Sequence, residues 1–287
     1  MEIIVTGAAG YIGSHLSYRL KQLNHTVYAY DNNLHQNNID FVDSIYDWDI
    51  TTPLEKTKNV DVVIHLAAKT KVHNSVLSPY DYYKTNIFGT NNVIETFNTK
   101  HFINCSTGAA FNPTTSPYAL SKKAAEDVVT EKCTNYTNLR FYNVSGNMGF
   151  NKFDEEHYHL IRKAAATANG LYNHMCIYGN DYNTKDGTCI RNYTHISDIV
   201  DSIINAINHG PMNTDFECLG TTEGYSVKEV VDTMREISKV NFPVFVEKRR
   251  LGDAAISVMP EQSILFNQSK SLYDQCQSAL EAERLTK

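Results

Sequence analysis

The sequence predicts an α/β fold, a doubly wound parallel sheet with a smaller lobe interleaved toward the C-terminus. Residues 2–6 are a short run of β-formers, and a turn with glycines at 7, 10 and 13 follows at once. Residues 14–23 then carry leucines at helical spacing. Residues 60–68 form an almost wholly apolar run, as expected of a central parallel strand buried on both faces. A strand, a glycine turn, a helix and further buried strands are typical of this fold class.

The glycine turn lies where a dinucleotide pyrophosphate binds in a Rossmann-like fold. Gly7 permits a tight turn, Gly10 lets the backbone approach the phosphates, and Gly13 lets the helix lie close to the strand. The start of the helix then offers free N–H groups and its positive dipole end to the anion. The spacing differs from the commoner G-x-G-x-x-G, and three glycines could form a simple turn. The flanking strand and helix favour cofactor binding.

An acidic residue ends the second predicted strand, residues 26–31. Asp31 follows Gly13 by 18 residues, near the separation expected of an acid that binds the adenosine ribose. A carboxylate there would repel a 2′-phosphate, and Asn32 and Asn33 offer no cation to hold one. The cofactor is therefore expected to be NAD rather than NADP. The alternative is that Asp31 is a turn residue.

Three further stretches continue the predicted sheet. Residues 48–50 are expected to end a third strand, where Asp49 could accept a hydrogen bond from an adenine amino group; a helix cap is an equal alternative. Residues 78–100 predict a long helix with a proline in its first turn. Residues 101–107 predict a strand with a hydroxyl residue at its carboxyl end, where ligands bind in such sheets. His65, within the apolar run, is expected to be a packed residue rather than a catalyst.

Tyr118 and Lys122 lie four residues apart in a predicted helix, so they share a face. A free tyrosine has a pKa of about 10, too high for a base at neutral pH, and a nearby ammonium favours the phenolate. The spacing alone is common, because the pair Tyr80/Lys84 has it too. Only Tyr118 follows a strand that ends in a hydroxyl residue, Thr107, and we read the other pair as helix surface.

Composition excludes several classes of protein. The chain has 287 residues, 42% of them hydrophobic and 20% charged, and a net charge of −6, which argues against nucleic acid or an anionic membrane as a partner. Its six cysteines include no C-x-x-C pair, so neither a zinc site nor a disulfide framework is indicated. No apolar run is long enough to cross a bilayer, and strand formers begin at Glu2, which leaves no room for a signal peptide. A cytoplasmic location is expected.

The remaining elements are expected to be a helix over 199–208, a strand over 216–219, a helix over 227–240 that Ser226 and Glu229 begin with a capping box, a last short strand from Phe245 and a closing helix over 269–284. Residues 1–150 should form the cofactor-binding domain, to which the chain should return from about 175–210. Residues 151–287 should form mainly the smaller lobe.

Together these motifs resemble the extended short-chain dehydrogenase/reductase family. The resemblance is carried by residues 6–15, 65–68, 106–107 and 118–122. Within that family, residues 177–198 are similar to the signature of the UDP-glucose (UDP-galactose) 4-epimerases, and nearly the whole chain is covered. The resemblance implies an NAD-dependent isomerase that interconverts UDP-glucose and UDP-galactose, with or without the N-acetyl forms, through a transient 4-keto intermediate.

The resemblance also implies a role for each matching residue. The catalytic residues are Thr107, Tyr118 as the acid/base, and Lys122. The cofactor-binding residues are Tyr118 and Lys122 together with Gly7, Gly10, Tyr11, Ile12, Gly13, Asp31, Asn32, Asp49, Ile50, Leu66, Ala67, Ala68, Lys71 and Asn86. The substrate-binding residues are Lys71, Thr107, Tyr118, Asn143, His159, Leu160, Cys176, Tyr178, Arg191, Tyr193, Arg250 and Asp253. Guanidinium forks suit phosphate oxygens, although without the family these arginines would read as salt bridges. No metal is implied.

Several residues depart from the family pattern. Only ten residues separate Thr107 from Tyr118, so a surface loop is missing. Gly108-Ala109 stands where dehydratases and decarboxylases carry acids, which disfavours both chemistries. Asn192 replaces the usual aspartate of an Arg-Asp-Tyr triplet. If the alignment has no gap, the small Ser257 leaves room for a 2-N-acetyl group.

Two other readings stay open. One is another UDP-sugar-modifying enzyme of the family, an epimerase of uronic or pentose sugars or a reductase. The other is a non-catalytic NAD-binding regulator. The family also leads us to expect a homodimer that pairs through the helices at 78–100 and 117–132.

Overall fold

The computed structural model describes residues 1–33, 39–55, 59–149, 159–250 and 253–285. The chain divides into two compact units. The first comprises Met1–Arg140 and Ser202–Cys218, and the second comprises Phe141–Asp201 and Leu219–Lys287. The first segment of the first unit thus ends before residue 150. The second segment of that unit spans 202–218, whereas the sequence led us to expect about 175–210.

A seven-stranded parallel sheet forms the first unit, in the order β11-β6-β5-β4-β1-β2-β3. Strand β1 pairs with β2 on one side and β4 on the other, so that Ile3 lies opposite Val27 and Val62. The strand order therefore reverses at β1, and ligands bind at the carboxyl ends of the strands at such a reversal. The strands are β1 (Glu2–Thr6), β2 (Thr26–Asp31), β3 (Ser44–Asp47), β4 (Asn59–His65), β5 (Asn98–Thr107), β6 (Tyr136–Phe141) and β11 (Glu217–Cys218).

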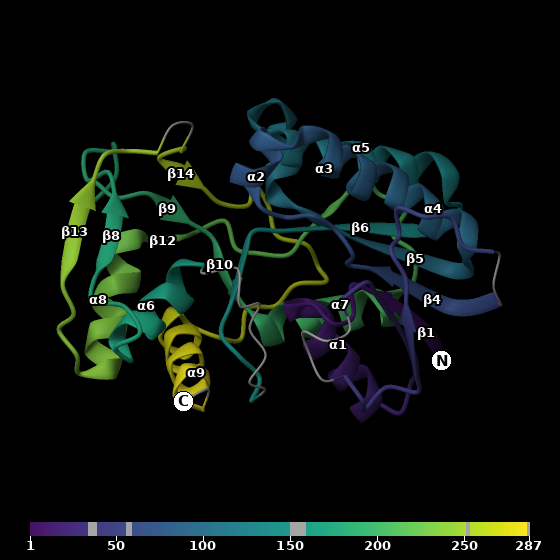
Figure 1. The fold of residues 1–287 in the computed structure, drawn as a ribbon, viewed down its shortest axis with the longest axis horizontal. Helices are drawn as coiled ribbons and strands as arrows, with labels where there is room; N and C mark the ends of the chain where they lie inside the picture. The colour runs from purple at the N-terminus through teal and green to yellow at the C-terminus, as the bar shows by residue number, and fades with distance from the viewer. Residues whose placement is uncertain (34–38, 56–58, 150–158, 251–252, 286–287) are drawn as a thin grey trace. The chain divides into compact units, whose positions relative to one another are not determined.

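Helices cover both faces of this sheet (Figure 1). One face carries α2 (Val72–Leu77), α3 (Pro79–Tyr83), α4 (Gly89–Thr96) and α5 (Pro117–Lys132). The other carries α1 (Tyr11–Gln22) and the part of α7 (Ile196–His209) that belongs to this unit. The doubly wound, Rossmann-like fold predicted from the sequence is confirmed. No helix in the described ranges has both the length and the apolar character of a membrane span.

The long helix predicted over 78–100 is wrong in two respects. A π-helical turn, Lys84–Phe88, separates α3 from α4, and the helix ends at Thr96. Strand β5 then begins at Asn98 rather than 101, because Asn98 and Thr99 pair with the first residues of β4. Tertiary pairing outweighs local helix propensity here.

The third strand also ends earlier than predicted, at Asp47. Trp48 lies just beyond it, donating its backbone N–H to Asp31 O over 3.1 Å and its indole N–H to Thr52 O over 3.0 Å. Its ring packs edge-on against Tyr30 and Phe97. Trp48 thus begins a turn that is fixed to the core of the first unit, whose members include Ile4, Tyr30, Trp48, Ile50, Val63, Val93, Phe97, Phe102 and Val129.

In its described residues, the second unit contains the helices α6 (Leu160–Ala168), α8 (Val227–Ser238) and α9 (Leu272–Leu285), the first residues of α7, and three small sheets. The helices α6, α8 and α9 contribute to one apolar core with β8, including Ile161, Met175, Ile177, Tyr193, Val230, Met234, Cys276 and Leu280. The sheets pair β7 (Asn143–Ser145) with β10 (Tyr193–His195), β8 (Met175–Tyr178) with β13 (Val244–Glu247), and β9 (Ile190–Arg191) with both β12 (Tyr225–Ser226) and β14 (Ile256–Ser257).

Local sequence signals located the ends of α8 well. Ser226 and Glu229 form the predicted capping box, and the helix ends at Ser238 because Lys239 takes a left-handed conformation with φ +59°. The strand at Phe245 is not the last one, since β14 follows it. That strand has only two residues and pairs with β9, which is distant in the sequence. No local sequence pattern therefore predicted it.

Candidate active site and nucleotide-binding residues

The glycine turn packs too tightly for side chains at two of its three glycines. Gly7 has φ +70°, and a Cβ there would lie 2.6 Å from the backbone N of Ala67. A Cβ on Gly13 would lie 2.1 Å from Gly7 O. Gly10 precedes α1, whose first residues are Tyr11, Ile12 and Gly13. The first N–H groups of a helix have no intrahelical acceptor, so this end of α1 can bind an anion.

Asp31 fastens the end of β2 to the glycine turn. Its carboxylate accepts hydrogen bonds from the backbone N–H of Ala9 and of Asn33, both over 2.9 Å. Burial raises the pKa of Asp31, and these N–H groups together with that of Asn32 oppose the rise. The residue therefore serves the turn and also presents a carboxylate beside the glycine turn, as the ribose-binding role requires.

The predicted adenine contacts lie in the turn after β3. Asp49 accepts a hydrogen bond from Thr51 N over 2.8 Å and another from the Asn32 side chain; although burial raises its pKa, these bonds and the charge of Lys84 leave it lowered. Asp49 thus closes a turn, and no helix begins there. Ile50 is buried, and its carbonyl accepts from Asn92 Nδ2 over 2.8 Å.

Asn86, within the π-helical turn, is fully engaged inside the protein. Its Oδ1 accepts from Lys69 N over 2.8 Å, and its Nδ2 donates to Lys69 O over 3.0 Å and to Ser121 Oγ over 2.9 Å. It thereby ties the loop of Leu66, Ala67 and Ala68 to α5. Lys71 ends this loop as the residue before α2, and its carbonyl accepts from Tyr82 Oη over 2.6 Å. These bonds give Asn86 a positioning role, and its predicted cofactor contact stays a prediction.

The three predicted catalytic residues come together at the end of β5 and the start of α5. The hydroxyl of Tyr118 is hydrogen-bonded to Thr107. Thr107 Oγ1 also accepts from Ala109 N over 3.2 Å, and Lys122 Nζ donates to Cys105 O over 2.8 Å. Ser116 caps α5 by accepting from Ala119 N, which fixes where the helix starts. Tyr80 of the second Y-x-x-x-K pair is exposed, as predicted.

The pKa of Tyr118 is raised in this structure, whereas the sequence led us to expect that Lys122 lowers it. Burial raises the pKa of Tyr118; the hydrogen bond from Thr107 acts against the rise, and the Tyr82 phenol adds to it. Burial likewise lowers the pKa of Lys122. In this structure Lys122 donates to the backbone carbonyl of Cys105, and the Tyr118 phenol, with its raised pKa, is protonated at neutral pH.

His65 is a packed residue, as expected. Its ring nitrogens lie 2.7 Å from Thr6 Oγ1 and 2.9 Å from Thr90 Oγ1. Complete burial, together with the charge of Lys122, lowers the pKa of His65 to about 3. The ring is therefore neutral and serves to join β1, β4 and α4.

In the second unit, the predicted substrate residues form two small groups. Arg191 Nη2 lies 3.4 Å from Asp253 Oδ1, and the neighbouring Asn143 donates to Asn192 O over 3.0 Å. The Arg250 guanidinium lies over the ring of Tyr178, 3.8 Å from its centroid. Each group thus contains one arginine.

The other predicted substrate residues of this unit lie apart from those groups or point inward. Cys176 lies on β8, two residues before Tyr178, and faces Phe245 of β13. His159 and Leu160 lie at the start of α6. Tyr193 is buried in the apolar core, where burial raises its pKa. Its ring therefore serves packing, and the substrate contact that the resemblance implied stays a prediction.

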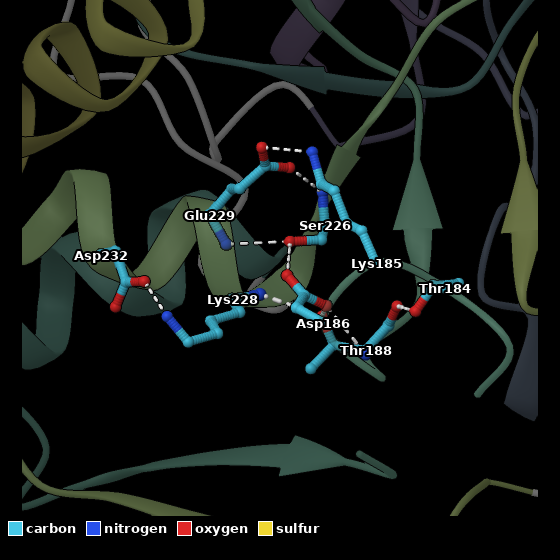
Figure 2. A network of polar contacts seen from close by, with 8 residues as sticks. All are labelled: Thr184, Lys185, Asp186, Thr188, Ser226, Lys228, Glu229 and Asp232. Atoms are coloured by element: carbon cyan, nitrogen blue, oxygen red, sulfur yellow. Dashed lines mark hydrogen bonds and ion pairs between the residues drawn. The ribbon is translucent and has the colours of Figure 1, made fainter. Parts of the chain in front are cut away.

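A polar network that the motifs did not reveal holds the loop before Arg191 (Figure 2). Asp186 accepts from Ser226 Oγ over 2.5 Å and from Thr188 N over 2.9 Å. Lys185 Nζ donates to Glu229 Oε1 over 2.5 Å. The loop is therefore fastened to the capped start of α8. The capping box was readable locally, but its partner Asp186 lies 40 residues away in the sequence.

A Rossmann-like sheet with this glycine turn, an acid after β2 and a Thr–Tyr–Lys group defines an extended short-chain dehydrogenase/reductase. More closely, the chain belongs to the NAD dependent epimerase/dehydratase family, whose sequence profile matches residues 3–218. In the described part of the chain, no group of three or more His, Cys, Asp or Glu side chains could hold a metal ion.

Individual relatives are similar over most of their length. A UDP-glucose 4-epimerase of Halalkalibacterium halodurans is 32% identical over 292 residues, covering 89% of this chain and 86% of that protein. The UDP-Glc/GlcNAc 4-epimerase structure from Campylobacter jejuni matches with a TM-score of 0.79 and 28% identity over 99% of each chain. A Brucella ovis UDP-glucose 4-epimerase in complex with NAD matches with a TM-score of 0.82 and 26% identity over 98% of this chain and 97% of that one.

Proposed function

We propose that the protein is an NAD-dependent UDP-sugar 4-epimerase that interconverts UDP-glucose and UDP-galactose. The observation that carries the proposal is the Thr107–Tyr118–Lys122 group, built into the same unit as the glycine turn and Asp31. The similarity to UDP-glucose 4-epimerases along most of the chain supports the choice of substrate.

The residues suit the cofactor. Gly7, Gly10 and Gly13 leave the start of α1 open to a pyrophosphate, and Asp31 presents its carboxylate to a ribose. NAD, when bound, supplies a reversible hydride acceptor. The protein's part is proton transfer: Tyr118, once it has given up the proton that it carries in this structure, takes the proton of the sugar 4-hydroxyl as C4 gives up its hydride, and Thr107 shares the hydrogen bond. The resulting 4-keto sugar would rotate within the site so that hydride can return to the other face of C4. Tyr118 would then give the proton back to the sugar oxygen.

The segment between Thr107 and Tyr118 argues against elimination chemistry. It consists of two short 3₁₀ helices, Gly108–Phe111 and Pro113–Thr115, and a proline begins α5. Dehydration and decarboxylation each need a further general acid or base, and Gly108 and Ala109 supply none. The proposed reaction needs only the tyrosine.

We propose that UDP-N-acetyl sugars are also substrates. Ser257, on β14, pairs with Arg191 of β9, which places a small side chain beside a predicted diphosphate residue. Turnover of UDP-glucose with none of UDP-N-acetylglucosamine would contradict this extension without touching the main proposal.

We further propose a cytoplasmic homodimer. All six cysteines, each in the described part of the chain, are free thiols, as is usual in a reducing compartment. The helices α2, α3 and α5 expose Val76, Leu77, Tyr80 and Leu120, and Leu77 is 71% exposed. Such a cluster of exposed apolar side chains marks an interaction surface. Sedimentation should give twice the chain mass, and Leu77→Glu should give the single chain.

The decisive experiment is product analysis by NMR. Purified protein with UDP-galactose and no added cofactor should form UDP-glucose to equilibrium, because the hydride is returned in each turnover. A uronic or pentose 4-epimerase would act on those UDP-sugars instead. A reductase would consume reduced cofactor in proportion to product, and a non-catalytic NAD-binding protein would leave every UDP-sugar unchanged.

A further inference from the structure

Three residues on one face of α5 each contact the end of β5. Tyr118, Lys122 and Glu126 follow one another at four-residue spacing, so their side chains lie in a row. The first is hydrogen-bonded to the Thr107 hydroxyl, and the second donates to Cys105 O over 2.8 Å. The third accepts a hydrogen bond from Ser106 Oγ over 2.5 Å. The catalytic pair is thus extended by one further turn of the helix.

A buried arginine, Arg140, forms an ion pair with Glu126. Arg140 of β6 donates from Nε to Glu126 Oε1 over 2.8 Å and from Nη2 to Oε2 over 2.5 Å. The two side chains are each only 3% exposed. The guanidinium also lies against two rings that meet edge-on, 3.9 Å from the centroid of Phe216 and 4.6 Å from that of Phe111. If Glu126 moved away from β5, Arg140 would lose either its bidentate contact with Glu126 or its contacts with the two rings.

A buried ion pair is weak evidence for stability, because removing two charges from water offsets much of their attraction. This one lies one helical turn from the proposed catalytic lysine. We propose that Glu126, fixed by Arg140, is a positioning residue that keeps Lys122 protonated and holds the catalytic face of α5 in register with the end of β5. The proposal rests on the proposed function of the Thr107–Tyr118–Lys122 group.

The groups that face Lys122 explain why Glu126 matters. Burial raises the pKa of the Cys105 thiol to about 12 and lowers that of His65 to about 3, so both are neutral near pH 7. The Tyr118 phenol has a raised pKa and is neutral as well. Burial lowers the pKa of Lys122, and Cys105 and then Glu126 oppose this. With the Cys105 thiol neutral, the Glu126 carboxylate is the negative charge among these described neighbours, although Arg140 offsets part of it.

The test compares Glu126→Gln with Asp127→Asn in the full-length chain. Asp127 is the matched control because it lies on the same helix, carries the same charge and forms an exposed pair with Lys123. The pKa of Lys122 is measured by NMR of ¹³Cε-labelled lysine, with its resonance assigned from Lys122→Arg. Glu126→Gln should lower that pKa by about one unit or more, as expected for losing a charge at this range in a poorly screened site. Asp127→Asn should leave it unchanged.

Epimerase kinetics supply the second readout. With Glu126→Gln, the alkaline limb of the pH profile of kcat should move to lower pH by a similar amount, while KM for the UDP-sugar stays within about twofold. Unchanged Lys122 pKa and pH profile in the folded variant would overturn the proposal, because a purely structural pair would alter only thermal stability.

Glu126→Gln leaves a buried arginine unpaired and could fail to fold. The double variant Glu126→Gln/Arg140→Met removes both charges, and it should still lower the pKa of Lys122, because Glu126 and not Arg140 is among the charges that act on the lysine. An unchanged Lys122 pKa in the double variant counts equally against the proposal. Failure of the proposed function is distinguishable: the wild-type protein would then turn over no UDP-sugar, whatever the lysine pKa.

Discussion

At the scale of single residues, spacing and residue type led to the catalytic group but not to its electrostatics. Tyr118 and Lys122 could be selected because a hydroxyl residue, Thr107, ends the strand before their helix. The bond from Lys122 to Cys105 O could not be foreseen, because it depends on how deeply α5 lies against β5. The raised pKa of Tyr118 has the same cause, burial in the folded unit.

Replacing Tyr118 with phenylalanine tests the assignment of the acid/base. The variant loses the phenolic oxygen and its bond to Thr107 but keeps the ring near Tyr82. We expect NAD to remain bound and kcat to fall by about 10²–10⁴-fold, the usual contribution of general acid–base catalysis. Activity within tenfold of the wild type, with NAD content unchanged, would exclude Tyr118 from that role.

Asn192 is buried and makes hydrogen bonds that an aspartate in its place could not make. Its Nδ2 donates to Thr221 O over 2.8 Å and to Glu223 O over 2.9 Å. A carboxylate cannot donate to these carbonyls. Gly220 is required beside it, because a Cβ there would lie 2.3 Å from Asn192 Oδ1.

Asn192→Asp should lower the free energy of unfolding by about 1–3 kcal/mol at pH 7, the cost of leaving buried polar groups unsatisfied. Burial beside two carbonyls raises the pKa of the introduced carboxyl in the folded state. The folded protein then binds the proton more tightly, so the loss should shrink as pH falls through that raised pKa and be largest above it. Urea unfolding from pH 5 to 8 measures this, with exposed Asn241→Asp as control. A loss independent of pH would contradict the explanation.

At the scale of elements, runs of β-formers and local caps predicted most strands and helices, and tertiary contacts changed the rest. The break in the helix over 78–100 occurs at the π-helical turn, where Asn86 bonds to Lys69 and Ser121. No local pattern contains those partners. The return of 202–218 to the first unit is likewise fixed by the pairing of β11 with β6.

Ser226 caps α8 through Glu229 N and also binds the distant Asp186, and Ser226→Ala tests what these two hydrogen bonds contribute. The variant loses the bond to Glu229 N and the bond to Asp186. Loss of an N-cap alone lowers stability by about 1 kcal/mol. Because Asp186 also anchors the loop that leads to Arg191, KM for the UDP-sugar should rise while kcat changes little. The matched control is Ser271→Ala, which removes the similar hydroxyl bond to Asp274 at the start of α9. An equal rise in KM in the control would show that the effect is not specific to this loop.

At the scale of the whole molecule, the division of labour follows the two units. The first holds the predicted cofactor residues and the catalytic group, and the second holds the arginines and most of the predicted sugar-nucleotide residues. The sequence could separate these roles because the glycine turn and the Thr107–Tyr118–Lys122 group precede residue 150, whereas the segment that resembles the epimerase signature follows it. It could not place the boundary at Arg140, because the chain continues there from β6 toward β7 without a linker in the sequence.

Cofactor choice can be measured as a property of the folded chain. A ligand that binds only the folded state stabilises it by about 2.7 kcal/mol at a hundredfold excess over Kd. NAD should therefore raise the Tm of nucleotide-free protein by several degrees. NADP at the same concentration should raise it far less, because its 2′-phosphate would meet the Asp31 carboxylate beside the glycine turn. Asp31→Asn removes that charge but keeps an oxygen able to accept from Ala9 N, so it should narrow the difference between the two cofactors. Equal stabilisation of the wild type by NAD and NADP would mean that Asp31 serves only the turn that it closes with Asn33.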